Sequence, residues 1–388
     1  MKNRPTAETP FVDFYSQHGI SPVSQDVSDL SRHFGRRRGL YAKLGLPPAL
    51  FKGRNILEFG PGSGHNALYT LSLGPALFHL VDGNPTGLEA AKERLGVCNQ
   101  NIGAELEYEL CLFDDFESAR SYDVVLSEGL LVYQKNPAGL ARKLAAFTIP
   151  GGVFVGTCAD SVSILSDLIR RLLAQAGADH CLSLKERAEA LAPYFESHFK
   201  NLPGMSRPIV DWLLDNAFQP FYGEMFSLAE AVTALEEGFI VFQSSPSFAA
   251  DWRWYKDITQ PDQAFNEAFK IQYRQNIHNL LDFRVRFEPR DENENTSLLH
   301  LCDEIFKQVK LYQSDYEDSA PLLKISDLVG AASENVGAIG PKADASALAL
   351  KDAAAALKAV AGKKSLPDCG RFTSFFGRGQ QYISFIKI

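Results

Sequence analysis

The residues best suited to chemistry form one loop, Glu58-Phe59-Gly60-Pro61-Gly62-Ser63-Gly64. It follows the apolar run at 55–59, which is typical of a short buried strand, and a helix-like run begins at His65. Glycines let a backbone come close to a ligand, and the start of a helix offers unpaired N–H groups. This pattern predicts a loop that cradles a cofactor.

The loop does not fit a nicotinamide dinucleotide well. That fingerprint is G-x-G-x-x-G, and the position of its third glycine is occupied here by His65. In addition, Glu58 at the end of the strand would repel a pyrophosphate, whereas it would help to bind a cationic amine. The loop therefore favours a cofactor that carries an amine.

Further acids stand at the ends of the next strand candidates. Asp82 follows the run 77–81, Asp114 and Asp115 follow 105–112, and Glu128 follows 122–126. In open α/β sheets, ligands bind beyond the carboxyl ends of the strands.

Loop and acids together resemble the motifs of class I S-adenosylmethionine (SAM)-dependent methyltransferases, over about 53–160 and more weakly near 239–243 and 381–386. The loop looks like the first motif, E-x-G-x-G-x-G. The resemblance implies that Asp82 holds the ribose hydroxyls, that an acid at 114 or 115 contacts adenine, and that Ser127 lies beside the methionine part. The implied cofactor-binding residues are Glu58, Gly60, Pro61, Gly62, Ser63, Gly64, Asp82, Gly83, Asp114, Asp115, Phe116 and Ser127.

Strand and helix patterns alternate from Gly53 onward, which predicts an α/β fold with a doubly wound, mostly parallel sheet. The resemblance implies seven strands. We expect an N-terminal helical arm at 1–52, a SAM-binding core at 53–160, a helical insertion at 161–226, a core helix and strand at 227–246, a mainly helical second insertion at 247–379 and a last core strand at 380–388. The first long helix is expected to begin near Ser24–Asp26, and the insertions are expected to form a lid or substrate domain.

Methyl transfer sometimes needs a base, and we name His18 and Glu128 as catalytic candidates, with His33 and His65 as further histidines. His18 lies in the N-terminal segment, which in many enzymes of this family folds over the cofactor. Proposed acceptor contacts are Trp252, Arg253 and Tyr255, which follow the strand near 239–243, and Arg378, which stands in a glycine-flanked turn. Each of these residues also has a purely structural interpretation, as an aromatic anchor or as the partner of a nearby carboxylate.

The composition of the chain excludes several classes of binding partner. The 388 residues carry 39 Lys+Arg against 47 Asp+Glu, a net charge of −8, which argues against nucleic acid or an anionic membrane as the main partner. The 6 cysteines have no CxxC pair, so neither a disulfide framework nor a zinc site is predicted, and no metal is expected. The first residues contain no apolar stretch fit for a signal peptide, and we expect a cytoplasmic protein without membrane insertion. The sequence does not indicate an oligomeric state.

The predicted function is SAM-dependent methyl transfer to oxygen or nitrogen of a small molecule held in an enclosed pocket. Three alternatives stay open: transfer of another group of SAM, such as aminocarboxypropyl; a non-catalytic protein that binds SAM as a partner; and a nicotinamide oxidoreductase, which His65 disfavours. The set of acids, retained at Glu58, Asp82 and Asp114, weighs against the non-catalytic alternative.

Overall fold

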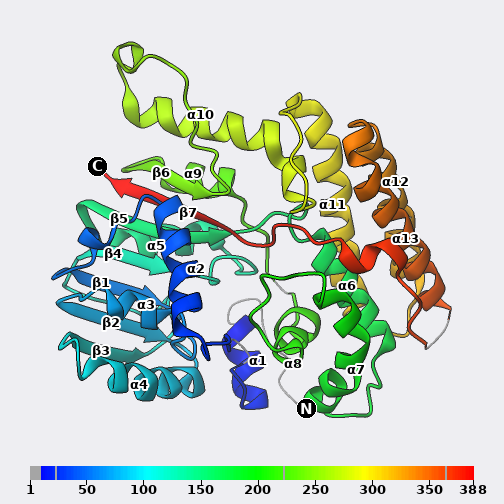
Figure 1. Ribbon diagram of the computed structural model, residues 1–388, viewed down its shortest axis with the longest axis horizontal. Coiled ribbons are helices and arrows are strands. Elements are labelled where there is room, and N and C mark those ends of the chain that lie inside the picture. Colours follow the sequence, from blue (N-terminus) through cyan, green and yellow to red (C-terminus); the bar gives the residue numbers. More distant parts are fainter. Residues whose placement is uncertain (1–9, 22–23, 222, 363–364) are drawn as a thin grey trace. The chain divides into compact units, whose positions relative to one another are not determined.

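The computed structural model describes residues 10–21, 24–221, 223–362 and 365–388, so the first nine residues of the expected arm lie outside it (Figure 1). The chain divides into two compact units. A sheet unit comprises 1–159, 221–273 and 380–388, and a helical unit comprises 160–220 and 274–379. The expected insertions at 161–226 and 247–379 match this division only in part, because 221–226 and 247–273 belong with the sheet.

The sheet unit is built on seven strands in the order β3-β2-β1-β4-β5-β7-β6. All neighbours run parallel except β7, which is antiparallel to both β5 and β6. This confirms the predicted mostly parallel, seven-stranded sheet. The strands are β1 (Asn55–Phe59), β2 (Leu77–Asp82), β3 (Glu105–Leu110), β4 (Tyr122–Ser127), β5 (Thr148–Cys158), β6 (Phe239–Ser245) and β7 (Gln381–Lys387).

Helices join the successive strands except β3 and β4, which are connected by residues 111–121 without a helix. The sheet unit contains α1 (Pro10–His18), α2 (Leu30–Lys43), η1 (Pro48–Leu50), α3 (Ala67–Ser72), α4 (Pro85–Asn99), α5 (Pro137–Ala146), α9 (Leu228–Leu235) and η3 (Tyr255–Asp257). The helix α10 (Pro261–Asn276) begins in this unit and crosses into the other.

The first long helix begins later than predicted, at Leu30. Asp26 accepts hydrogen bonds from the amide and hydroxyl of Ser28, which closes a turn instead of a helix, and Asp29 caps α2 by accepting from the amide of Arg32 at 2.9 Å. Side chains that bond to nearby backbone groups compete with helix formation in this way.

The two faces of the sheet bury different cores. On one face, residues of α2 and α3 pack against alternate positions of the strands, among them Ile56, Phe78, Leu80, Val124 and Val155. On the other face, Phe59, Phe116 and Phe147 form an aromatic cluster. Because Glu58 alternates with Phe59, its side chain lies on the face of α2.

The helical unit contains α6 (Leu165–Gly177), α7 (Leu184–Phe199), α8 (Ile209–Trp212), η2 (Leu213–Phe218), η4 (Ile277–Leu280), α11 (Glu292–Tyr312), α12 (Ala320–Gly337), η5 (Pro341–Ala343), α13 (Asp344–Ala361) and η6 (Gly370–Ser374). Its centre holds the fully buried Arg170, which donates to the carbonyls of Phe372 and Phe375 and lies 3.6 Å from the ring centre of Phe376. Within the described ranges, no helix combines the length and the apolar composition that a membrane span needs.

Candidate active site

The glycine loop leaves β1 in a conformation that needs its glycines. Gly60, Gly62 and Gly64 have φ of 67°, 53° and 77°, in the left-handed region. At Gly64 a Cβ would also lie 3.0 Å from the backbone of Ala91 on α4, so the missing side chain lets the loop pack against this helix. The amide of Gly60 donates to the carbonyl of Val81 at 2.8 Å, which ties the loop to the end of β2.

Asp82 ends β2 directly beside this loop. Its carboxylate accepts hydrogen bonds from the amide of Gly62 at 3.0 Å and from that of Asn84 at 2.8 Å. Burial raises the pKa of Asp82 to about 6, against the lowering effect of these amides. The acid is thus fixed in orientation between the loop and the turn into α4.

Glu58 is a buried carboxyl group that lacks a full set of hydrogen bonds. Its Oε2 has no hydrogen-bond partner among the described residues. Burial, with the nearby charge of Glu128, raises the pKa of Glu58 to about 8, although Arg37 lowers it. A buried acceptor without a donor is costly, so this atom suits a ligand that brings an N–H group and positive charge.

Glu128, one predicted base, is held by an ion pair. Both of its oxygens accept from Arg37 of α2, at 2.6 and 2.8 Å, and the two side chains are only 8% and 11% exposed. Arg37 also donates to the hydroxyl of Tyr41, which hydrogen-bonds Thr70 at 2.8 Å. A carboxylate engaged at both oxygens is a poor proton acceptor, so this geometry argues against the predicted role of Glu128.

This ion pair leads to a stability prediction. Replacing Arg37 with alanine leaves a buried carboxylate without its partner, and we expect the free energy of unfolding to fall by about 3–5 kcal/mol. Removing both charges, with Arg37→Met and Glu128→Gln, should cost clearly less. Urea denaturation of the three proteins measures this. A loss below about 1 kcal/mol for Arg37→Ala would mean that the pair behaves as an exposed one.

The histidines fall into two groups. His33 and His65 are buried and bonded: a ring nitrogen of His33 meets the carbonyl of His65, and Nδ1 of His65 lies 2.9 Å from the hydroxyl of Ser63. Burial lowers the pKa of His65 to about 4, so it is neutral near pH 7. His18 is exposed at the end of α1, with its ring against Phe14.

The N-terminal arm lies across the end of β2. A Cβ at Gly83 would come within 2.8 Å of Val12 of α1, and the side chain of Asn84 donates to the carbonyl of Ile20 at 3.2 Å. The arm that carries His18 therefore packs beside the turn that positions Asp82.

The cofactor-binding residues predicted at 114–116 differ in their exposure. Asp114 and Asp115 are exposed in the turn after β3. Phe116 was predicted to contact the cofactor, but it is fully buried, with ring centres 5.2 Å from Phe59 and 5.0 Å from Phe147. It is a core residue, because a ring enclosed by other rings has no face left for adenine.

We expect Phe116→Ala to lower the free energy of unfolding by about 3–4 kcal/mol through the cavity it leaves, and Phe116→Leu by roughly 1 kcal/mol. Affinity for S-adenosylhomocysteine should stay within about twofold of the wild type in the leucine variant. Denaturation and calorimetry test the two statements. A leucine variant of native stability with weakened cofactor binding would restore the cofactor role.

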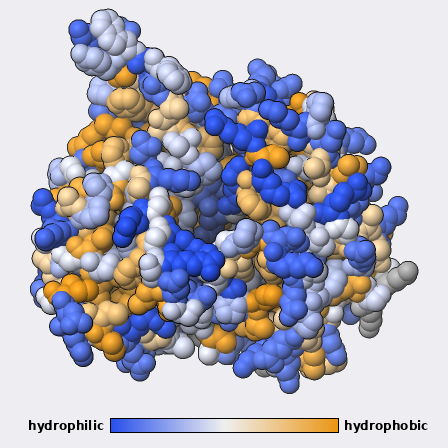
Figure 2. Space-filling view, in the orientation of Figure 1, coloured by the Kyte–Doolittle hydropathy of each residue, from blue (hydrophilic) through white to orange (hydrophobic). Residues whose placement is uncertain are grey.

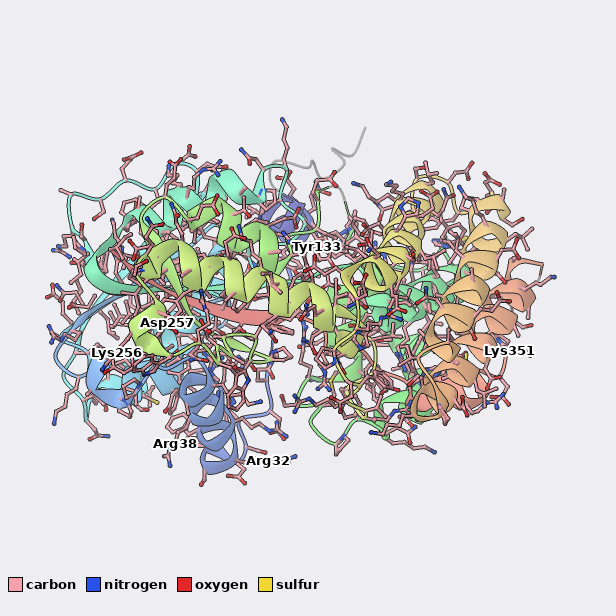
Figure 3. The ribbon with its side chains drawn as sticks, turned by 90° about the horizontal axis from the view of Figure 1, so that it is seen from above. Arg32, Arg38, Tyr133, Lys256, Asp257 and Lys351 are labelled. Carbon is pink, nitrogen blue, oxygen red and sulfur yellow. The ribbon has the colours of Figure 1, made fainter. Side chains whose placement is uncertain are left out.

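The predicted acceptor contacts belong to two different units. Trp252 and Tyr255 are exposed on the segment between β6 and α10, where Figure 3 labels Lys256 and Asp257, and Arg253 is bonded to Asp251. Arg378 belongs to the helical unit and donates to the carbonyls of Asn279 and Val285 at 2.8 and 3.0 Å. The guanidinium of Arg378 is thus engaged with backbone carbonyls, and that of Arg253 with a carboxylate. Neither group is available to an anionic acceptor in this arrangement.

A further residue, Tyr133, lies in the segment after β4 (Figure 3). Its φ of 69° makes it the one non-glycine residue with positive φ among the described residues. The ring stacks on Phe221 with centres 4.3 Å apart, and its amide donates to the carbonyl of Glu224 at 2.8 Å. Strained backbone of this kind gathers at functional sites, yet no sequence signal distinguishes it from an ordinary loop tyrosine.

Ser127 aligns with Phe59 across β4 and β1 and is completely buried, and its hydroxyl has no hydrogen-bond partner in the described residues. Nearby, a Cβ at Gly60 would overlap Leu130, so the segment after β4 lies directly against the glycine loop. The glycine loop, Asp82 and Ser127 thus lie together at the carboxyl ends of β1, β2 and β4.

Comparison with known proteins agrees with this geometry. Residues 57–154 match the family described as "Methyltransferase domain". A curated relative, the ubiquinone biosynthesis O-methyltransferase of Aeromonas salmonicida, is 30% identical over 152 residues, which are 37% of this chain and 53% of that protein. The chain thus spans about half of its length.

Solved structures with similarity include the N-methyltransferase NodS of Bradyrhizobium japonicum WM9 with S-adenosyl-L-homocysteine (16% identity, 38% of this chain and 74% of that one, TM-score 0.31). Another is the magnesium protoporphyrin IX methyltransferase of Synechocystis PCC 6803 (12% identity, 60% and 89%, TM-score 0.37). The family match shows a methyltransferase domain at residues 57–154, the part of the sheet unit that carries the glycine loop and Asp82.

Proposed function

We propose that this protein transfers the methyl group of SAM to an oxygen or nitrogen of a small molecule. The observation that carries the proposal is Glu58, a buried carboxyl with an oxygen lacking a donor, beside a glycine loop and Asp82. An amino-acid ammonium supplies both the missing donor and the missing positive charge. The curated relative is named as an O-methyltransferase, which favours oxygen as the acceptor atom.

Each residue has a binding task in this proposal. Glu58 would pair with the α-ammonium, Asp82 would accept from the ribose hydroxyls, and either Asp114 or Asp115 would accept from the adenine amine. The backbone of 60–64 and Gly83, with Ser127, would line the methionine part. When bound, SAM supplies a sulfonium methyl group for in-line displacement, which these residues assist by fixing the sulfonium's position and excluding water.

If the acceptor needs a base, His18 is the better of the two candidates. Glu128 would first have to break its hydrogen bonds with Arg37. Alanine at His18 should then remove one ionisation from the pH–rate profile. We further propose that the acceptor is not a nucleic acid and that the protein works in the cytoplasm, on the basis of its acidic balance and its cysteines without a CxxC pattern.

Calorimetry with S-adenosylhomocysteine tests the proposal directly. Binding is expected in the micromolar range that is common for enzyme ligands. Incubating the protein with SAM and candidate phenols or amines, followed by mass spectrometry of the product, then distinguishes methyl from aminocarboxypropyl transfer. No measurable binding of either SAM or S-adenosylhomocysteine would overturn the proposal.

A further inference from the structure

Three large side chains are exposed together on the segment between β6 and α10. Trp252 is 98% exposed, Trp254 59% and Tyr255 72%, and we call these three residues the aromatic tip. The segment rises away from the sheet in Figure 1 and stands out as a projection at the upper left of Figure 2. Side chains of this size are normally covered, so the aromatic tip needs an explanation.

The segment that carries the aromatic tip is anchored to α10. Phe248 is buried, with its ring centre 6.0 Å from that of Phe269 and 5.6 Å from that of Tyr273. Arg253 donates to both oxygens of Asp251 and to the carbonyl of Ala264 at 2.9 Å, which ties the segment to the first turns of α10. The exposed rings are therefore presented by an anchored segment, so little ordering entropy remains to be lost when they bind.

The charges around the tip cancel. Arg253 is neutralised by Asp251, and Lys256 is followed by Asp257. The ammonium of Lys256 lies 4.9 Å from the ring centre of Trp254 and 5.9 Å from that of Tyr255. Amphipathic rings without net charge are the side chains that prefer the headgroup region of a bilayer.

We propose that the aromatic tip docks this protein on the surface of a phospholipid bilayer, with Trp252 and Trp254 in the headgroup region. The shape of the tip favours lipid over a protein partner. A stable protein complex buries about 800 Å² of matched surface on each side, which a projection of three side chains does not offer. A fluid bilayer, in contrast, closes around a projecting side chain from all directions. This inference is independent of the proposed methyl transfer.

Vesicle binding tests it with the full chain. We would mix the protein with phosphatidylcholine vesicles, measure co-flotation, and follow tryptophan emission with and without brominated phosphatidylcholine. The third tryptophan, Trp212, is buried and serves as an internal reference, so the change reports on the tip. We expect a blue shift, quenching by the brominated lipid, and a partition coefficient that falls at least about tenfold in the Trp252→Ala/Trp254→Ala variant.

Val97→Ala is the matched control, because Val97 is 68% exposed on α4 of the same unit, and it should partition like the wild type. Because the tip has no net charge, 0.5 M salt should leave binding within about twofold. Absence of flotation, or binding that survives in the double variant, would overturn the proposal. So would binding confined to anionic vesicles and lost in salt. Self-association without vesicles that the double variant abolishes would assign the tip to a second copy instead. If the double variant does not fold, quenching of the wild type by brominated lipid decides alone.

Discussion

Replacing Asp82 with alanine is expected to weaken the binding of S-adenosylhomocysteine about 100-fold, measured by titration calorimetry. The carboxylate accepts from the amides of Gly62 and Asn84, so its loss removes the proposed ribose acceptor and one of the bonds that hold the loop to β2. Hydrogen bonds to a charged group contribute about 1.5–3 kcal/mol each, and every 1.4 kcal/mol is tenfold in affinity.

Glu89→Ala is the control for removing an acid from the same unit. Glu89 lies on α4 and pairs with Lys92 at the surface, so the variant should bind within about twofold of the wild type. Asp82→Asn keeps the shape of the side chain but exchanges one acceptor for a donor. Its affinity for S-adenosylhomocysteine should lie between those of Asp82→Ala and Glu89→Ala. Wild-type affinity in Asp82→Ala, with the fold intact by circular dichroism, would remove Asp82 from the cofactor site.

Glu58→Gln is expected to abolish a proton release that accompanies cofactor binding. The pKa of Glu58 is about 8 in the ligand-free protein, so the group is mostly protonated at pH 7. An incoming ammonium favours the carboxylate, and binding then expels the proton. Between about pH 5.5 and 7.5 the affinity of the wild type should rise with pH by up to tenfold per unit, and that of the glutamine variant should change much less.

Calorimetry in two buffers of different ionisation enthalpy counts the released proton. Equal observed enthalpies for the wild type in both buffers would contradict the prediction. Three ionisable neighbours enter the same balance: Glu128 and Asp82 raise the pKa of Glu58, and Arg37 lowers it. The contribution of Asp82, whose own pKa is about 6, is separated by repeating the titration with Asp82→Asn.

The same group makes the ligand-free protein less stable in alkali. The folded protein holds the Glu58 proton up to about pH 8, whereas the unfolded chain releases it near the ordinary value of about 4.3. The contribution of Glu58 to stability is therefore complete below about pH 4.3 and is lost as the pH rises from there through 8. Glu58→Gln should flatten this part of the stability profile in urea denaturation.

The sequence was sufficient to predict the glycine loop and the acid beside it, because these features are local. The strand, the glycine loop and the acid after the next strand follow one another, and their roles depend on backbone conformation that Gly60, Gly62 and Gly64 encode directly. Alternation of apolar strands with helices then predicts a parallel sheet whose carboxyl edge gathers them.

The sequence could not indicate contacts between residues that lie far apart along the chain. Arg37 meets Glu128 across 91 positions, and Arg378 meets the carbonyl of Asn279 across 99, so no spacing rule links them. Phe116 follows two acids and looks like a motif residue, but burial, which the sequence does not specify, makes it part of the core. Trp252 is proposed as an acceptor contact because ligands of α/β sheets bind in loops after the carboxyl ends of strands, whereas its side chain is 98% exposed.

The position of β7 has a consequence for how this protein is made. Residues 381–387 pair with β5 on one side and with β6 on the other, and the hydroxyl of Ser384 donates to the carbonyl of Leu44, 340 positions earlier. During synthesis, β6 has no strand neighbour until the ribosome has produced the helical segment 274–379 and then β7 itself. The emerging chain thus carries an open sheet edge for many seconds, and a chaperone that shields this edge should raise the yield of folded protein.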